Sequence, residues 1–342
     1  MHCGMGLAGK ANYASRKIPQ ALAYFRQALA HGEDPRVHAF ERWACWMMLG
    51  KFECAWMEAD RSEPPWKGDI RSPRHLLIRC LRGLGDAIQF LRYVPMLSSR
   101  CGRITVQAPH GLHPLVTSIP GVGAVISREA PVDEHLYDCE IECSNLPYAA
   151  RTTIGTIPDS IRVPGVADPP ACVTMLRAAC TGSLKTGIVW SAGAWNPTRS
   201  IPVELFLSEL PQSGIAWISL QRDCGYLPEC VQVPANIVNA ETGPASLLAT
   251  AAIIAELDLV ITVDTMIAHL AGSLGKPVWT ILQHSADWRW MLGSSTPWYP
   301  SMRLFRQPLP GDWATALREV RAKLDDFRHA AYLRTIRAQK SA

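Results

Sequence analysis

Residues Leu257–Trp279, LDLVITVDTMIAHLAGSLGKPVW, decide the fold class. The uninterrupted apolar run Leu257–Val263 predicts a strand that is buried on both faces, as in a parallel sheet. A helical pattern follows Asp264-Thr265 and ends at Gly275-Lys276-Pro277, before a second apolar run. This order is typical of an α/β fold. Ligands bind beyond the carboxyl ends of such strands, so we expect Asp264 and Thr265 to line a ligand site.

The composition describes a folded protein of several domains. The chain has 342 residues, of which 48% are hydrophobic and 19% are charged, and its formal net charge is +4. This length favours two or three domains. The net charge is too small to indicate nucleic-acid binding. No apolar run approaches the roughly 18–20 residues of a transmembrane segment, and the first residues lack a signal-peptide core, so we expect a cytoplasmic protein.

Eleven cysteines are scattered through the chain. An odd number without a secretion signal indicates reduced thiols. Cys139 lies close to Cys143, and Cys224 lies close to Cys230, but neither pair has the CxxC spacing of a zinc site. We therefore expect no metal.

The first region, residues 1–70, is predicted to be helical. Ala21 and Ala55 lie 34 residues apart in similar settings, and this period resembles that of tetratricopeptide repeats. Two units are fewer than a free-standing array needs. We expect them either to dock on the next domain or to be preceded by further repeats in a longer protein.

Strands alternate with helices after Arg74, which predicts two Rossmann-like domains with parallel sheets. The Pro-rich stretch Arg162–Pro170 suggests a linker, and we place the domains at residues 71–180 and 181–342, the second with a helical tail. The expected strands are His75–Cys80, Arg103–Ala108, Ala124–Ser127, Tyr137–Glu142, Lys185–Ser191, Ile215–Leu220, Asn236–Val238, Leu257–Val263 and Val278–Leu282.

A glycine turn, Gly83-Leu84-Gly85-Asp86, follows the first of these strands. The glycines permit positive φ and let a ligand approach the backbone. Asp86 has two interpretations: a carboxylate that caps the next helix, or a base that accepts a proton from an attacking hydroxyl. Pro95 should end or kink that helix about one turn after Leu91.

The loop Ser191–Ser200 follows the first strand of the second set. Its small residues and Arg199 suit a diphosphate, because a guanidinium is always charged and offers forked donors to phosphate oxygens. The alternative is a solvated loop with a surface arginine.

His269 lies in the helix that follows Thr265 and nearly opposite its apolar stripe at 100° per residue. It is therefore predicted to contact a phosphate or sugar oxygen rather than the core, although a helix buried on two sides would bury it. Asp264 and Thr265 have the alternative role of helix caps.

Two aromatic segments, Asp287–Met291 and Thr296–Pro300, follow the last expected strand. Trp and Tyr faces suit sugar rings, and Arg289 could meet an anionic group. The alternative, which we favour slightly, is that both segments pack in the core at the domain edge.

Four blocks together resemble a known family: LRGLGDAIQFLRYVPML, GIVWSAGAWNPTRSIPVELF, LDLVITVDTMIAHLAGSLGKPVW and DWRWMLGSSTPWYPSMRLFRQ. They are similar, in the same order, to bacterial tetratricopeptide-repeat proteins with a heptosyltransferase-like (glycosyltransferase family nine) C-terminal region. The resemblance covers about Arg74 to Trp313 and implies a GT-B fold, in which two Rossmann-like domains face a cleft.

The resemblance also implies an inverting glycosyltransferase that uses a nucleotide-diphospho-sugar as substrate, with no cofactor and no metal. Asp86 matches the catalytic base. The donor would bind the second Rossmann-like domain, and the implied donor-binding residues are Ser191, Gly193, Arg199, Gln221, Asp264, Thr265 and His269. A protein or glycan acceptor would bind near Gly83, Gly85 and Arg92, and the repeats would recruit a protein partner.

Two positions depart from the family pattern. Leu81-Arg82 stand where many relatives have Glu-Gln, and Met266 stands where heptosyltransferases have glycine. These departures favour a second hypothesis, a non-catalytic binding or scaffold protein with a degenerate GT-B region. A third hypothesis is a sugar-nucleotide epimerase or hydrolase, which would turn over the donor without an acceptor.

Overall fold

The computed structural model describes residues 2–166, 171–179, 183–211, 213–221, 237–240 and 247–341. The chain divides into two compact units. The first unit comprises Met1–Arg162 and Ser285–Pro300, and the second comprises Val163–His284 and Ser301–Ala342. The first break falls at the start of the Pro-rich stretch. The division into three domains that was expected from the sequence stays a prediction.

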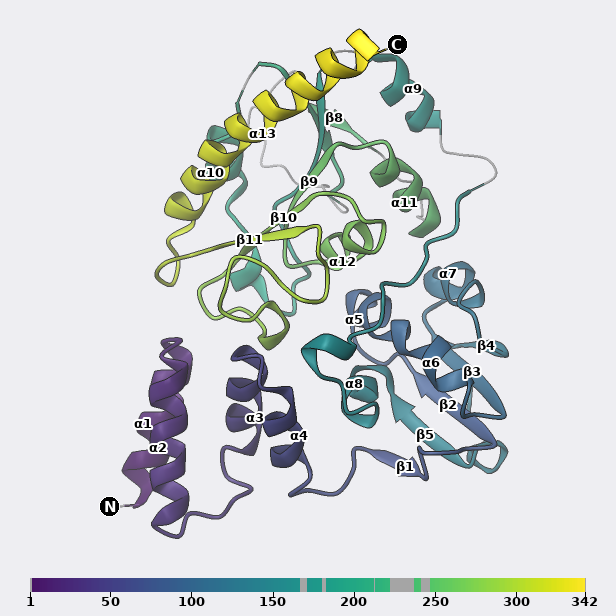
Figure 1. Cartoon of the computed structure of the whole chain (residues 1–342), viewed down its shortest axis with the longest axis vertical. Helices are drawn as coiled ribbons and strands as arrows, with labels where there is room; N and C mark the ends of the chain where they lie inside the picture. Colours follow the sequence, from purple (N-terminus) through teal and green to yellow (C-terminus); the bar gives the residue numbers. More distant parts are fainter. Residues whose placement is uncertain are drawn as a thin grey trace. The chain divides into compact units, whose positions relative to one another are not determined.

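The first unit begins with helices and continues with an α/β region (Figure 1). Its elements are α1 (His2–Ala14), α2 (Ile18–Ala30), α3 (Ala39–Met48), α4 (Phe52–Ala59), β1 (Trp66–Gly68), β2 (His75–Arg79), α5 (Leu84–Phe90), α6 (Val94–Ser98), β3 (Arg103–Ala108), α7 (His113–Thr117), β4 (Ala124–Ser127), β5 (Cys139–Glu142) and α8 (Leu146–Ala149).

Strands and helices mostly alternate along the described residues of the second unit. Its elements are α9 (Ala171–Ala179), β6 (Leu184–Val189), α10 (Val203–Ser208), β7 (Ile215–Ser219), β8 (Ile237–Asn239), α11 (Leu247–Ala255), β9 (Leu259–Val263), α12 (Met266–Ser273), β10 (Val278–Leu282), β11 (Met302–Arg306) and α13 (Trp313–Ser341).

The N-terminal helices pack in two pairs, α1 with α2 and α3 with α4. Ala21 and Ala55 occupy the same position in α2 and α4, and both are fully buried. Gly50 turns the chain between α3 and α4 at φ +70°, a conformation that glycine adopts without a steric penalty. The four helices lie within the predicted helical region, which also contains β1, and the all-α tetratricopeptide class stays a prediction.

The helix pair α3/α4 docks on the α/β part of the first unit. Trp56 donates from Nε1 to the Thr152 carbonyl at 2.7 Å, and its ring stacks on Tyr148 with centroids 5.4 Å apart. Phe52 stacks on Trp298 at 6.0 Å. Aromatic pairs of this kind contribute about 0.5–1.5 kcal/mol beyond the area that they bury. The helical region thus packs on the α/β region that follows it, as expected, whereas its repeat class stays a prediction.

The sheet of the first unit has the order β1-β5-β2-β3-β4. Its last four strands run parallel and were all expected from their apolar runs. The sequence missed β1, which pairs antiparallel with β5. This strand has three residues, none of them buried, so its sequence has too few apolar positions to show a strand pattern.

The sheet of the second unit has the order β11-β10-β9-β6-β7-β8, with every pair parallel. Counted from β6, this is the order 3-2-1-4-5-6 of the Rossmann fold. The α/β prediction with Rossmann-like sheets is confirmed. The sequence missed β11, because Arg303 and Arg306 interrupt its apolar residues.

Helices cover both faces of the second sheet (Figure 1). Alternate residues such as Ile188, Trp217 and Ile261 form a core with α10 and α13. α12 packs on β9 and β10, and α11 packs on α12. Since each strand is covered on both sides, its residues form the unbroken apolar runs seen in the sequence.

Gly275 ends α12 and fixes the turn into β10. It adopts φ +68°, and the following N–H of Lys276 donates to the Ala271 carbonyl at 3.1 Å. These are the features of a Schellman motif, in which a glycine in the left-handed region closes the helix. The Gly275-Lys276-Pro277 stop signal is confirmed.

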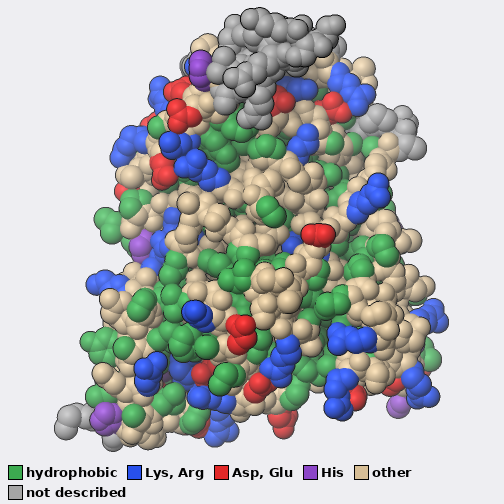
Figure 2. Space-filling view, viewed as in Figure 1, with side chains coloured by type: hydrophobic (Ala, Val, Ile, Leu, Met, Phe, Trp, Pro, Cys, Tyr) green, Lys and Arg blue, Asp and Glu red, His purple; other side chains and the backbone are tan. Residues whose placement is uncertain are grey.

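The surface carries charges of both signs. On the face drawn in Figure 2, Lys and Arg side chains are interspersed with Asp and Glu. Within the described part of the chain, no helix is long and apolar enough to cross a membrane. The cytoplasmic location and the lack of a nucleic-acid partner stay predictions.

Candidate functional site

The strand order of the second sheet locates a ligand site. Strand order reverses between β6 and β9, which lie side by side although two strands separate them in sequence. Ligands of open α/β sheets bind outside the carboxyl ends of the strands at such a switch point. The loop Ser191–Ser200 follows β6, and Asp264-Thr265 follow β9. The second unit therefore brings together the two segments that the sequence assigned to the donor.

Gln221 and Ser200 fix the loop after β6. The Gln221 amide oxygen accepts the N–H groups of Trp190 and Ser191 at 3.2 and 2.9 Å, and its amide nitrogen donates to the Ser191 carbonyl. The Ser200 hydroxyl accepts the N–H of Ala192 at 3.0 Å. Gln221, expected to bind the donor, thus holds the backbone of the loop. Its direct contact with a donor stays a prediction.

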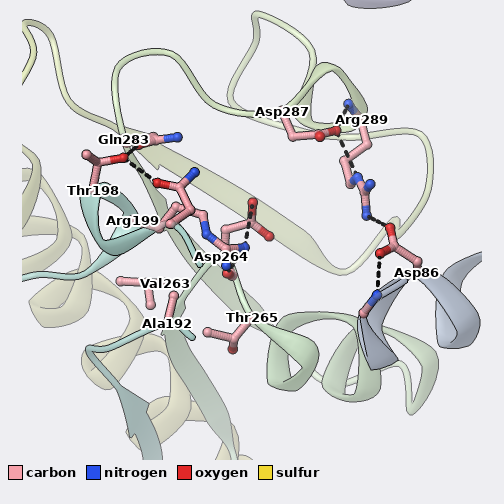
Figure 3. Close-up of polar contacts among 12 residues, drawn as sticks. Asp86, Ala192, Thr198, Arg199, Val263, Asp264, Thr265, Gln283, Asp287 and Arg289 are labelled. Atoms are coloured by element: carbon pink, nitrogen blue, oxygen red, sulfur yellow. Dashed lines mark hydrogen bonds and ion pairs between the residues drawn. The ribbon is translucent and has the colours of Figure 1, made fainter. Parts of the chain in front are cut away.

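Arg199 reaches from this loop to the end of β9 (Figure 3). Its Nη1 donates to the Asp264 carbonyl at 2.9 Å and lies 3.9 Å from the Asp264 carboxylate. The guanidinium lies over the Trp195 ring, 4.2 Å from its centroid. Its side chain is only 12% exposed, and its Nε is buried with no hydrogen-bond partner among the described residues. A buried donor without an acceptor is costly, so this nitrogen is available to an anion.

Trp195 is the feature of this loop that the sequence interpretation overlooked. Its indole is 78% exposed although one face lies on Arg199. Gly193 lies beside it, since a Cβ at that position would be 3.4 Å from Trp195 Cδ1. The signal in the sequence that could have indicated this contact is the position of Trp195, four residues before Arg199.

Thr265 caps the N-terminus of α12. Its hydroxyl accepts the Ile267 N–H at 3.3 Å and lies 3.1 Å from the Thr262 hydroxyl. The capping alternative is therefore confirmed for Thr265. The first turn of α12 still presents backbone N–H groups and partial positive charge, beginning with the half-buried Met266.

His269 is buried, with 2% of its surface exposed. The prediction that its helical angle keeps it out of the core is wrong. Because α12 packs on β9 and β10 on one side and α11 on another, the side opposite its main apolar stripe is covered as well. The donor contact of His269 stays a prediction.

The turn after β2 places Asp86 in the first turn of α5. The Asp86 Oδ2 accepts the Gly83 N–H at 3.1 Å, which is the capping role weighed from the sequence. Neither Gly83 nor Gly85 has positive φ, so the expected conformational reason for glycine is wrong. A Cβ at Gly83 would lie 3.3 Å from Asp86 Oδ2, which is a tight contact, so a larger residue there would press on the carboxylate.

Arg289 meets Asp86 in the first unit (Figure 3). Its Nη1 lies 2.8 Å from Asp86 Oδ1, and its Nε donates to Asp287 Oδ1 at 2.9 Å. In the structure the anionic partners of Arg289 are side chains of the protein itself, and its contact with an anionic ligand stays a prediction. The two residues are 203 positions apart in sequence, and no local pattern signals their pairing.

Arg92 is buried against the second aromatic segment, Thr296–Pro300. It is 3% exposed, donates to the Gln89 and Trp298 carbonyls at 2.6 and 2.9 Å, and lies over the Tyr299 ring. These contacts place it inside the first unit and give its predicted acceptor-side role no direct support. Pro95 was predicted to end or kink the helix about one turn after Leu91, but α5 ends earlier, at Phe90, in a 3₁₀ turn at Leu91–Tyr93, and Pro95 lies in the first turn of α6.

Cys143, near this turn, is not a candidate for a nucleophile. Cys80 follows β2 and Cys143 follows β5, and both are buried. The hydrogen bond with Cys80, followed by burial, raises the pKa of the Cys143 thiol well above its usual value. A neutral thiol is a poor nucleophile and a poor metal ligand.

No three His, Cys, Asp or Glu side chains among the described residues are grouped so that they could hold a metal ion. A cofactor-free and metal-free reaction stays a prediction.

Comparison with known proteins gives one family match. Residues 231–310 match glycosyltransferase family 9 (heptosyltransferase). This match supports a heptosyltransferase-like glycosyltransferase domain, and the matched residues include Asp264, Thr265 and His269.

One relative aligns over most of the chain. Protein FlbA of Caulobacter vibrioides is 25% identical over 305 residues, which are 81% of this chain and 51% of FlbA. The chain thus spans about half the length of the curated relative that it matches.

Two solved structures are similar at low sequence identity. The ADP-heptose lipopolysaccharide heptosyltransferase II of E. coli is 12% identical and has a TM-score of 0.49, over 75% of this chain and 99% of that one. A glycosyltransferase family 9 protein of Veillonella parvula is 12% identical and has a TM-score of 0.45, over 70% of this chain and 87% of that one.

Proposed function

We propose that this protein transfers a sugar from a nucleotide-diphospho-sugar to a hydroxyl group of a protein or glycan, with inversion and without a metal. The observation that carries the proposal is the buried Arg199 guanidinium, whose Nε lacks a partner among the described residues, at the switch point of a Rossmann-type sheet. The family match over residues 231–310 supports the same class of reaction.

The donor diphosphate is proposed to bind between Arg199 and the first turn of α12. Charge-assisted hydrogen bonds from a guanidinium are about twice as strong as those between neutral groups. The N–H groups and partial positive charge at the start of α12 add to the attraction. When the nucleoside diphosphate departs, the same groups offset the negative charge that develops on its leaving oxygen.

Asp86 is proposed as the base. The acceptor hydroxyl gives its proton to the Asp86 carboxylate while its oxygen bonds to the anomeric carbon. The bond from that carbon to the diphosphate oxygen breaks, and the nucleoside diphosphate leaves with the electron pair. Asp86 Oδ1 is buried and lies 2.8 Å from Arg289 Nη1, but among the described residues it has no hydrogen bond of normal geometry, so one of its lone pairs is not committed to a donor.

The helices α1–α4 are proposed to recruit the acceptor or another protein partner. They belong to the first unit, which also contains Asp86. An acceptor held by these helices would therefore be held by the unit that carries the base.

Two observations favour a second function, a non-catalytic binding protein. The Asp86 Oδ2 caps α5 through the Gly83 N–H, and this contact alone accounts for an aspartate at the position. The bulky Met266 at the start of α12 favours the same reading.

The test is a panel of ADP-, GDP- and UDP-sugars, with binding followed by thermal shift and donor breakdown followed by mass spectrometry. We expect one donor to raise the melting temperature and to be consumed, and consumption to require an acceptor. The Asp86→Asn variant should bind this donor and consume it only at a strongly reduced residual rate. Binding without turnover by the wild type would favour the second function, and turnover without any acceptor would indicate a hydrolase or epimerase. No binding of any donor would contradict both enzyme readings.

A further inference from the structure

We propose that Arg289 is the positioning residue of the catalytic carboxylate, and that it acts by fixing Asp86 Oδ1 in the orientation that accepts the acceptor's proton. The inference rests on the proposed function, because it assigns to Arg289 a part of that same reaction. Arg289 comes from the segment between β10 and β11, yet this segment belongs to the first unit with Asp86.

The two oxygens of the Asp86 carboxylate have different partners. Oδ2 accepts the Gly83 N–H at 3.1 Å and is committed to the start of α5. Oδ1 lies 2.8 Å from Arg289 Nη1 but has no hydrogen bond of normal geometry among the described residues. An ion pair without an in-line hydrogen bond holds the oxygen in place and leaves it a lone pair for a proton.

Arg289 is itself held from several directions. Asp287 accepts from its Nε at 2.9 Å and its backbone N–H at 3.1 Å, and Gln89 Oε1 accepts from Nη1 at 3.3 Å. The guanidinium lies over the rings of Phe90 and Trp288, 5.6 and 5.7 Å from their centroids. The side chain is 14% exposed. A guanidinium held in this way restricts the Asp86 carboxylate to a single orientation.

A capped 3₁₀ turn and an aromatic contact hold the backbone around Arg289. Asp287 caps a 3₁₀ turn over Trp288–Trp290, and Met291 follows at φ +49°, a conformation that is uncommon for a side chain of this kind. Trp288 also contacts Trp43 of α3, with ring centroids 5.1 Å apart. The neighbour of Arg289 in sequence therefore packs on the helical region. This packing distinguishes the Arg289–Asp86 pair from an exposed surface salt bridge, whose side chains are held only by each other.

Arg289→Met is the most direct test, because methionine keeps an unbranched apolar stem between Phe90 and Trp288 and removes the charge. With the donor identified by the panel above, we expect kcat to fall by about ten- to a hundredfold, since small misplacement of a catalytic group costs this much. The KM for the donor should stay within about twofold, because Arg289 makes no donor contact in the proposal. Arg289→Lys should recover part of the lost kcat.

A double-mutant cycle shows whether Arg289 acts through Asp86. If it does, Arg289→Met should lower kcat in the wild type and have no further effect on the residual rate of Asp86→Asn. Arg128→Met is the matched control, since Arg128 pairs with Glu129 at 3.6 Å on the surface of the same unit. Its kcat should equal that of the wild type. Melting temperatures of all variants are measured alongside.

The outcomes are distinguishable. An active wild type with an unchanged kcat in Arg289→Met overturns the role of Arg289 and leaves the proposed function intact. Equal losses in the wild-type and Asp86→Asn backgrounds also overturn it, because they show a structural effect. A wild type that consumes no donor overturns the proposed function and this role with it.

Discussion

Replacing Arg199 by alanine should weaken the binding of a nucleoside diphosphate. Arg199 is 12% exposed and its Nε has no partner among the described residues, so the guanidinium can add a bond to phosphate without breaking one. A hydrogen bond to a charged group contributes about 1.5–3 kcal/mol. At about 1.4 kcal/mol per factor of ten, the loss of one such bond raises Kd by about 10- to 140-fold.

The assay is isothermal titration calorimetry with ADP, GDP and UDP, using the diphosphate that binds the wild type. Arg199→Lys keeps the charge but not the fork, so its Kd should lie between those of the wild type and Arg199→Ala. Arg321→Ala is the control, because Arg321 is 54% exposed and pairs with Glu209 at 3.6 Å on the surface of the same unit. An unchanged Kd in a folded Arg199→Ala protein would refute the reasoning.

Three further outcomes are expected. Trp195→Ala should raise the same Kd about two- to fivefold in calorimetry, because a cation–π contact that orients Arg199 contributes about 0.5–1 kcal/mol; an unchanged Kd contradicts this. Thr265→Ala should lower the free energy of unfolding in urea by about 1 kcal/mol through loss of the helix cap, and Thr265→Ser should restore it. Arg151 hydrogen bonds lower the pKa of Asp60, so Asp60→Asn should cost about 0.5 kcal/mol at neutral pH in the same assay. A lowered pKa stabilises the fold above the unfolded-state pKa of ~3.9, so this cost should shrink as the pH falls from that value through the lower pKa of the folded state.

The parallel strands could be predicted because each carries its own signal. The run Leu259–Val263 is wholly buried, and a strand covered on both faces has an apolar residue at every position. β1 and β11 could not be predicted in the same way. β1 is an exposed edge strand of three residues, and β11 carries two arginines in five residues.

The candidate site was predictable where its residues directly follow strands. Arg199 and Asp264 come together because β6 and β9 are neighbours in the sheet, which follows from the strand order of a Rossmann-type fold. The Arg289–Asp86 pair was not predictable, since it depends on a segment that leaves the second unit and returns to the first. The burial of His269 was missed because a helical angle reports one apolar stripe and not the number of covered sides.

The central claim is that the carboxyl edge of β6 and β9 holds a donor diphosphate. Its most direct test is a crystal structure of the wild-type protein with the nucleoside diphosphate that binds in calorimetry. The account predicts phosphate oxygens within hydrogen-bond distance of the Arg199 guanidinium and of the N–H groups that begin α12. A diphosphate bound elsewhere, with Arg199 still bonded only to Asp264, would contradict the account.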